Sequence, residues 1–159
     1  MKIAILCSDF DENNETNGAS IINNILINFG VTDISRFDMF KKEFPAVNEI
    51  NSFNGVIMTG SRASIYNDKE WIKKFLELVK IITIPTLGIC LGYQAVTTAF
   101  GGHVESSGKF EEGFKEILIN DKDVQNSLLN NINQKFMVYE SHGDIATELP
   151  KGANLISRN

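Results

Sequence analysis

The chain has 159 residues, of which 43% are hydrophobic and 22% charged, and its net charge is −5. These proportions are typical of a soluble globular protein, and the length suits one domain with a substantial hydrophobic core. The acidic balance and the lack of a basic run argue against nucleic-acid binding, and no apolar stretch is long enough to span a membrane. We therefore expect a single cytoplasmic domain over residues 1–159, with two reduced cysteines and neither a nucleic-acid nor a membrane partner.

The first two thirds of the sequence alternate between strand and helix patterns. The predicted strands are short and almost continuously apolar, as in a parallel sheet that is covered on both faces. The predicted helices repeat apolar residues at helical spacing, and Asp68 is expected to cap the second of them. Because strands and helices alternate, we expect parallel pairing through right-handed crossovers. The elements, in chain order, are strand 2–7, helix 19–29, strands 31–37 and 55–59, helix 68–80, strand 84–89 and helix 91–100.

The pattern changes after residues 101–102, both glycine. The rest of the chain predicts strands 103–106, 114–119 and 136–140, a brief helix at 124–129 and a further strand that begins at 154. The whole succession predicts the α/β class, namely a three-layer, doubly wound and mostly parallel sheet with an added antiparallel portion. In such sheets ligands bind beyond the carboxyl ends of the strands. The loops that follow Thr59 and Ile89 both lie at that edge, so we expect them to contribute to one site.

The most informative motif is Gly88-Ile89-Cys90-Leu91-Gly92, which lies where a predicted strand gives way to a helix. Gly-x-Cys-x-Gly at such a junction is the pattern of a nucleophile elbow, a sharp turn that projects one reactive side chain. The glycines permit the strained backbone and let a substrate come close. The positive end of the following helix is expected to favour the thiolate form of Cys90. A buried, inert cysteine is the competing interpretation, and the flanking glycines favour the nucleophile.

A cysteine that attacks a carbonyl group needs donors for the developing oxyanion and normally a histidine base. The backbone N–H of Leu91 and the turn Gly60-Ser61, at the end of the neighbouring strand, are the candidate donors. The sequence holds two histidines, His103 and His142, as candidate bases.

The remaining chemistry-bearing residues favour simpler interpretations. Cys7 ends the first strand and is predicted to be a small buried side chain. No cysteine and histidine share zinc-site spacing, and the pair Glu111-Glu112 is predicted to lie on the solvated surface. We therefore expect no metal and no cofactor.

Four blocks, in the same order along the chain, resemble the class I (triad) glutamine amidotransferase family and within it the GMP synthase-like subgroup. The resemblance implies a flavodoxin-like amidotransferase fold. It also implies that Cys90 attacks the side-chain amide of glutamine, releases ammonia and leaves a γ-glutamyl thioester that water cleaves. The blocks are residues 58–66, 88–94, 100–104 and 141–144.

The resemblance also implies roles for individual residues. The backbone N–H groups of Ser61 and Leu91 would form the oxyanion hole. Gln94, one helical turn after Cys90, would hold the amino-acid end of glutamine. Further contacts to the substrate, partly through backbone groups, are expected from Gly60, Ser141, His142, Gly143 and Asp144.

The sequence departs from the family at one essential point. The family takes its catalytic histidine and acid from a His-x-Glu element near the carboxyl terminus, and this sequence has no such element. His142 matches a histidine of the binding loop, and His103 matches a position with no catalytic role. We therefore expect a truncated form of a longer domain, with its C-terminal part missing and most of its activity lost, since triad members act as a unit. A shortened protein that uses Cys90 and His142 in another way is the less favoured view.

Three functions remain open. The first is a glutaminase domain that supplies ammonia to a synthetase or other acceptor subunit. The second is a γ-glutamyl peptidase or hydrolase, which would use the same thioester and differ only in its substrate profile. The third is a catalytically inactive, glutamine-binding or regulatory domain, which would bind glutamine tightly without turnover. In each case the expected ligand is glutamine or a γ-glutamyl compound.

Overall fold

A computed structural model describes residues 1–9, 17–119, 129 and 132–158. Within them four parallel strands form one sheet in the order β2-β1-β3-β4. This is the start of the flavodoxin-like order, which confirms the doubly wound fold predicted from the sequence. The register pairs Ile3 of β1 with Ile34 on one side and with Gly55 on the other. The strands are β1 (Lys2–Cys7), β2 (Asp33–Asp38), β3 (Gly55–Met58) and β4 (Thr86–Gly88).

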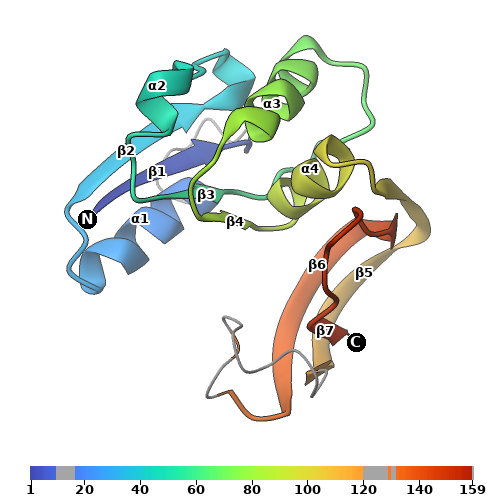
Figure 1. Ribbon diagram of the computed structural model, residues 1–159. Helices are drawn as coiled ribbons and strands as arrows, with labels where there is room; N and C mark the ends of the chain where they lie inside the picture. The colour runs from blue at the N-terminus through green and yellow to red at the C-terminus, as the bar shows by residue number, and fades with distance from the viewer. Residues whose placement is uncertain (10–16, 120–128, 130–131, 159) are drawn as a thin grey trace.

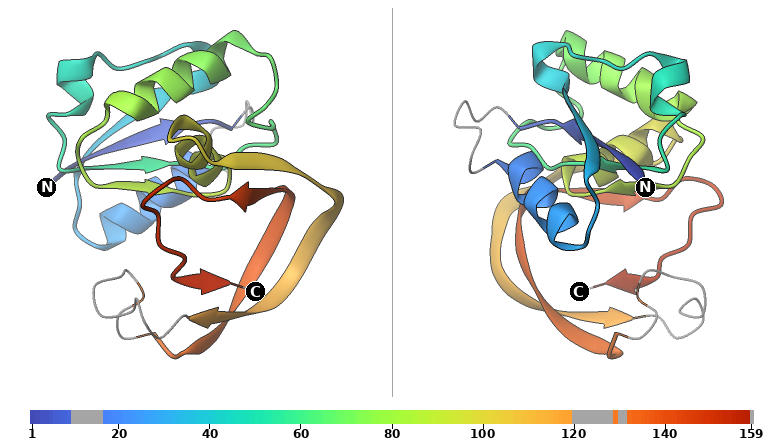
Figure 2. Two further views of the ribbon diagram at one scale, coloured as in Figure 1. Left: turned by 45° about the vertical axis from the view of Figure 1, so that its right-hand side comes forward. Right: turned by 90° about the vertical axis from the view of Figure 1, so that its left-hand side faces the viewer.

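Helices cover both faces of this sheet (Figures 1 and 2). Successive residues of β1 point to opposite faces of the sheet, and both faces are apolar. Ile5 packs with Ala19 of the first helix, whereas Leu6 belongs to the larger cluster with Phe75 and Leu91 on the opposite face. The three predicted layers are therefore present. Among the described helices, none combines the length and the apolar character needed to cross a membrane. The helices are α1 (Gly18–Asn28) on one face and α2 (Val47–Ile50), α3 (Glu70–Ile81) and α4 (Leu91–Ala99) on the other.

The N-terminus of α3 corrects one prediction. Lys69, not Asp68, occupies the N-cap position, and no side chain caps this helix. Asp68 instead forms an ion pair with Lys73 in the first turn. The predicted core face of α3 is present, with Trp71 and Phe75 both buried. Two short elements escaped prediction, α2 and a 3-10 turn over Met39–Lys41, because three or four residues are too few to show a periodicity.

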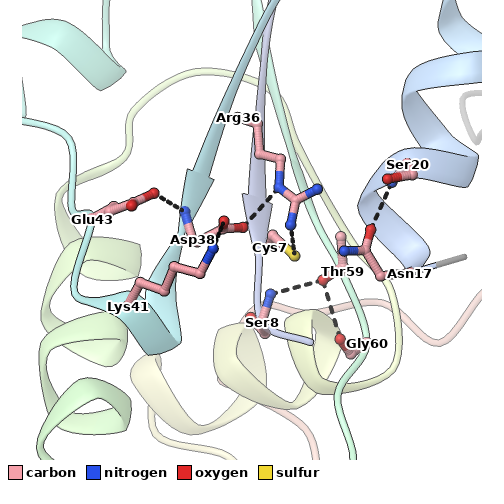
Figure 3. Close-up of polar contacts among 10 residues, drawn as sticks. All are labelled: Cys7, Ser8, Asn17, Ser20, Arg36, Asp38, Lys41, Glu43, Thr59 and Gly60. Atoms are coloured by element: carbon pink, nitrogen blue, oxygen red, sulfur yellow. Dashed lines mark hydrogen bonds and ion pairs between the residues drawn. The ribbon is translucent and has the colours of Figure 1, made fainter. Parts of the chain in front are cut away.

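Cys7 is completely buried at the end of β1, as predicted, and both cysteines are free thiols. Arg36 of the neighbouring β2 donates from Nη2 to Cys7 Sγ at 3.5 Å and from Nε to Asp38 at 2.7 Å (Figure 3). Burial raises the pKa of the Cys7 thiol, so this cysteine is a neutral part of the core.

The antiparallel portion is a second sheet in the order β6-β5-β7. Strands β5 and β6 form a long curved ribbon that leaves the parallel sheet beside α4 (Figures 1 and 2). The separate strands predicted at 103–106 and 114–119 are one strand, because the polar residues between them form an irregularity in the pairing rather than a loop. The strand predicted from 154 begins at Ser157, and the helix predicted at 124–129 falls almost wholly outside the described residues. The strands are β5 (His103–Ile119), β6 (Lys135–Glu148) and β7 (Ser157–Arg158).

Helix α4 lies unusually close to the parallel sheet. A Cβ atom added at Gly92 would lie 2.6 Å from both Cβ and O of Met58 in β3. A Cβ atom at Gly88 would lie 2.6 Å from the backbone of the first turn of α4. Real Cβ atoms do not tolerate such distances, so only glycine at both positions lets α4 start where it does.

We predict that Gly92→Ala destabilises the fold by about 3 kcal/mol or more, because the clashing atoms of Met58 belong to a central strand. The control is Gly18→Ala, where the added Cβ would meet nothing closer than Thr59 Cβ at 3.8 Å. Alanine also favours the helical backbone there. Urea unfolding of both variants and the native chain measures the difference. Equal stability of Gly92→Ala and Gly18→Ala would contradict the assigned contact.

Candidate active site

Cys90 lies at the sharp turn between β4 and α4. Its backbone has φ 50° and ψ −107°, and Lys42 is the one other non-glycine residue with positive φ in the described part of the chain. Positive φ is disfavoured for side chains with a Cβ atom, and such strain concentrates at functional sites. The thiol remains partly exposed. The backbone thus has the strained turn that the Gly-x-Cys-x-Gly pattern predicts.

Two backbone N–H groups converge on the thiol. The N–H of Leu91 and the N–H of Ser61 both hydrogen-bond to Cys90. Leu91 is the first residue of α4, so its N–H has no acceptor within the helix. Gly60 lets the turn after β3 come close, since a Cβ atom there would lie 3.2 Å from Cys90 Cβ. Two backbone donors beside one thiol are the groups from which an oxyanion hole can be built.

Opposing effects act on the pKa of the Cys90 thiol. Burial raises the pKa of Cys90 above its ordinary value, and this effect exceeds the opposing effect of the Leu91 and Ser61 hydrogen bonds. The negative charge of Asp144 raises the pKa further. The Leu91 N–H at the start of α4 lowers the pKa of Cys90, the direction expected from the helix N-terminus, but burial outweighs it and the pKa is raised overall.

A cavity of about 380 Å³ lies beside Cys90. Its lining includes Cys90 and Ser61 at the edge of the parallel sheet, Gln94 from α4, and residues 141–144 from β6. Gly60 and Leu91 lie against the cysteine itself. The structure thus brings every predicted site residue to one place, although they come from both sheets.

Residues 141–144 lie inside β6 and not in a loop, which corrects the prediction of a binding loop. His142 pairs with Glu111 of β5, and Asp144 pairs with Ser106. In β6, Gly143 alone lies between His142 and Asp144. In β5, the four residues 107–110 lie between the residues that pair with them. Irregularities of this kind bend a strand and redirect side chains, and they are frequent next to active sites. Here the irregularity places Phe110 in the cavity lining with residues 141–144.

A hydrogen bond joins the two sides of the site. The Tyr66 hydroxyl donates to Asp144 Oδ1 at 2.9 Å, and so connects the segment after β3 with β6. Arg62 from the same segment also lines the cavity. Sequence reasoning gave Arg62, Tyr66 and Phe110 no role, because they lie in irregular stretches where no periodicity shows which side chain faces a ligand.

Gln94 presents an acceptor to the cavity. Its side chain lines the cavity, the residue is only 5% exposed, and no described residue donates to its Oε1 atom. A buried acceptor without a donor costs about 1–3 kcal/mol. A ligand that donates to Oε1 would recover this free energy.

Neither histidine acts on the thiol in this structure. His103 is exposed and lies 3.4 Å from Glu105. His142 lines the cavity, but its Nε2 atom lies 3.5 Å from Glu140, and its buried Nδ1 atom has no hydrogen-bond partner among the described residues. The described site therefore combines a thiol and two donors without an imidazole bonded to the sulfur.

Glu111, Glu140 and His142 form the one cluster in the described part of the chain with side chains suited to a metal ion, each offering an atom within 4.8 Å of the others. The side chain of Glu111, which was predicted to be solvated, is partly buried. Its carboxylate pairs with Lys109 at 2.8 Å, which lowers the pKa of Glu111. Glu140 lies 3.5 Å from His142 Nε2 within the same cluster.

We predict that Asp144→Asn lowers the pKa of Cys90, because it removes a negative charge that opposes the thiolate. The rate of alkylation by iodoacetamide at fixed pH below the thiol pKa should then rise. Asparagine keeps an oxygen that can accept the Tyr66 hydrogen bond. Glu116→Gln, which removes a carboxylate paired with Lys135 elsewhere on the ribbon, is the control and should leave the rate unchanged. A slower reaction in Asp144→Asn would overturn the assigned electrostatics.

Comparisons with known proteins agree with the fold and with the family resemblance. The model of the family "Glutamine amidotransferase class-I" matches residues 16–159. The chain is 38% identical to a glutamine-hydrolyzing GMP synthase of Chlorobaculum tepidum over 61% of this chain and 18% of that protein. It is 30% identical to one subunit of the glutamine-hydrolyzing GMP synthase of Sulfolobus acidocaldarius over 70% of this chain and 58% of that protein. The chain thus spans less than two thirds of the length of either relative.

Solved structures share the fold. A glutamine amidotransferase from Methylobacillus flagellatus matches with a TM-score of 0.79 and 24% identity, over 99% of this chain and 61% of that chain. The glutaminase domain of Trypanosoma brucei CTPS, with bound acivicin, matches with a TM-score of 0.62 and 14% identity, over 92% and 68% of the two chains. Identities this low show the fold alone. Because the family model covers nearly the whole sequence, the chain belongs to the class I glutamine amidotransferase family.

Proposed function

We propose that the chain is a glutaminase domain of the GMP synthase type, with glutamine in the cavity and Cys90 as the nucleophile. The observation that carries the proposal is the convergence of the Ser61 and Leu91 N–H groups on a strained cysteine beside a polar cavity. A buried structural cysteine needs neither a strained backbone nor two donors. Family membership supports the same reaction.

The reaction begins when Cys90 Sγ attacks the carbonyl carbon of the glutamine side-chain amide. The oxyanion of the tetrahedral intermediate accepts hydrogen bonds from Ser61 and Leu91. The C–N bond then breaks, and the leaving nitrogen takes up the proton that the thiol has given up and departs as ammonia. Water hydrolyses the remaining γ-glutamyl thioester, which yields glutamate and restores the thiol.

The charges around the cavity suit the amino-acid end of glutamine. The Asp144 carboxylate and the unsatisfied Oε1 atom of Gln94 are acceptors for an α-ammonium group. The Arg62 guanidinium offers the opposite charge for the α-carboxylate. The hydrogen bond from Tyr66 fixes the orientation of Asp144. Both charges in one cavity favour a free zwitterionic amino acid over a blocked peptide.

The released ammonia would pass to a partner that forms a C–N bond. One similar protein is named as one subunit of a GMP synthase, which motivates a separate synthetase chain as that partner. Two free thiols fit a reducing cytoplasm.

The direct test is covalent trapping together with turnover. A glutamine analogue with a diazo ketone in place of the amide should label Cys90, and glutamine should slow the labelling by competition. We predict that Cys90→Ser abolishes both the labelling and any release of glutamate, whereas Cys7→Ser retains them. Turnover by the native chain is expected to be slow, since among the described residues neither His103 nor His142 is hydrogen-bonded to the thiol. Glutamate release by Cys90→Ser at the native rate would refute the assignment.

One observation favours a second function, a glutamine-binding domain without turnover. The pKa of Cys90 is raised and neither histidine bonds to it, so the thiol lacks the usual means of activation. Calorimetry separates the two functions. Binding of glutamine with neither labelling nor glutamate release would establish the second and exclude the first.

A further inference from the structure

We propose that Thr59 is a positioning residue, which orients the N–H of Ser61 toward Cys90. The inference rests on the proposed function, in which that N–H is an oxyanion donor. Thr59 follows β3 directly and is 1% exposed, so its hydroxyl is shielded from water. It does not line the cavity, and sequence reasoning treated it only as the last residue of a strand.

Three hydrogen bonds hold Thr59 between the first strand and the turn. Its N–H donates to the Leu6 carbonyl at 3.0 Å, and its hydroxyl accepts the N–H of Ser8 at 2.9 Å. The same hydroxyl donates to the Gly60 carbonyl at 3.1 Å (Figure 3). The first two bonds fix Thr59 to β1 and the residue after it. The third transmits that position to the peptide between Gly60 and Ser61.

The geometry of the peptide bond converts this contact into an orientation. In a trans peptide the carbonyl oxygen and the following N–H point in opposite directions. Because the Gly60 carbonyl is held toward Thr59, the N–H of Ser61 must point away from Thr59, and Cys90 is the group that accepts it. Gly60 has no Cβ atom to restrict its dihedral angles, so the peptide would otherwise rotate easily.

A purely structural role for Thr59 makes a different prediction. In that case the hydroxyl only satisfies the buried N–H of Ser8, and its removal lowers stability without changing the chemistry of Cys90. The two interpretations are separated by a measurement at the thiol and not by stability.

The test compares the full chain with Thr59→Val, which keeps the shape but removes the hydroxyl, and Thr59→Ser, which keeps the hydroxyl. Thr97→Val is the matched control, because Thr97 is equally buried and its hydroxyl donates to the Tyr93 carbonyl within α4. The rate of alkylation of Cys90 by iodoacetamide is measured against pH, with peptide mapping to separate it from Cys7. Circular dichroism confirms that each variant is folded under the conditions used.

We expect the profile of Thr59→Val to move to higher pH, because the Ser61 N–H no longer stabilises the thiolate. Thr59→Ser and Thr97→Val should coincide with the native chain. The other ionisable groups around the cavity, Asp144, His142 and Arg62, are the same in all variants. Coincidence of Thr59→Val with the native profile, or an equal movement in Thr97→Val, would overturn the inference.

A measurement on the native chain keeps the inference testable if Thr59→Val does not fold. The amide proton of Ser61 should change its NMR chemical shift as the Cys90 thiol titrates, and an amide that does not respond would also overturn the inference. These readouts need no glutamine, so they are independent of the proposed function. Where the chain hydrolyses glutamine, Thr59→Val should lower kcat up to about 100-fold with KM unchanged, because the donor acts on the transition state. Absence of hydrolysis by the native chain would count against the proposed function alone.

Discussion

The backbone contact between α4 and β3 determines where the reactive group can lie. Gly92 meets Met58 with no room for a side chain, and Gly88 meets the first turn of the same helix. Only Ile89 and Cys90 lie between β4 and α4, and in this short turn Cys90 adopts the positive φ. The packing of α4 against the sheet compensates the strain, which is of the order of 1–3 kcal/mol for such a residue.

The two sheets contribute different residues to the site. The parallel sheet fixes the thiol and both N–H donors within a few residues of its carboxyl edge, where backbone geometry is rigid. The antiparallel ribbon contributes the opposite wall, with Asp144 as its charged group. The Tyr66 hydrogen bond connects the two parts. In the proposed function the reacting groups therefore depend on the central fold, whereas recognition of glutamine depends on how the ribbon lies against it.

Much of this arrangement could be predicted from the sequence, for identifiable reasons. Short apolar runs and the Gly-x-Cys-x-Gly motif act locally, so the strands, their parallel pairing and the turn at Cys90 could be predicted from them. The ribbon did not, because serine and glycine at 106–108 are typical of a loop and only pairing with β6 shows them to be part of a strand. The roles of Arg62 and Tyr66 depend on contacts with distant residues, which no local pattern reveals. The same is true of the raised pKa of Cys90, since burial and the Asp144 charge arise only in the folded chain.

The position of Asp144 links binding of the proposed substrate to the reactivity of the thiol. Its negative charge raises the pKa of Cys90 in the unliganded site. In the proposed function an α-ammonium group pairs with this carboxylate and offsets its charge, so the thiolate becomes easier to form when glutamine is bound. By linkage the thiolate in turn strengthens binding of the ammonium group by the same factor. An empty site then keeps its cysteine protonated and unreactive, and the substrate itself supplies part of the activation that the two histidines do not.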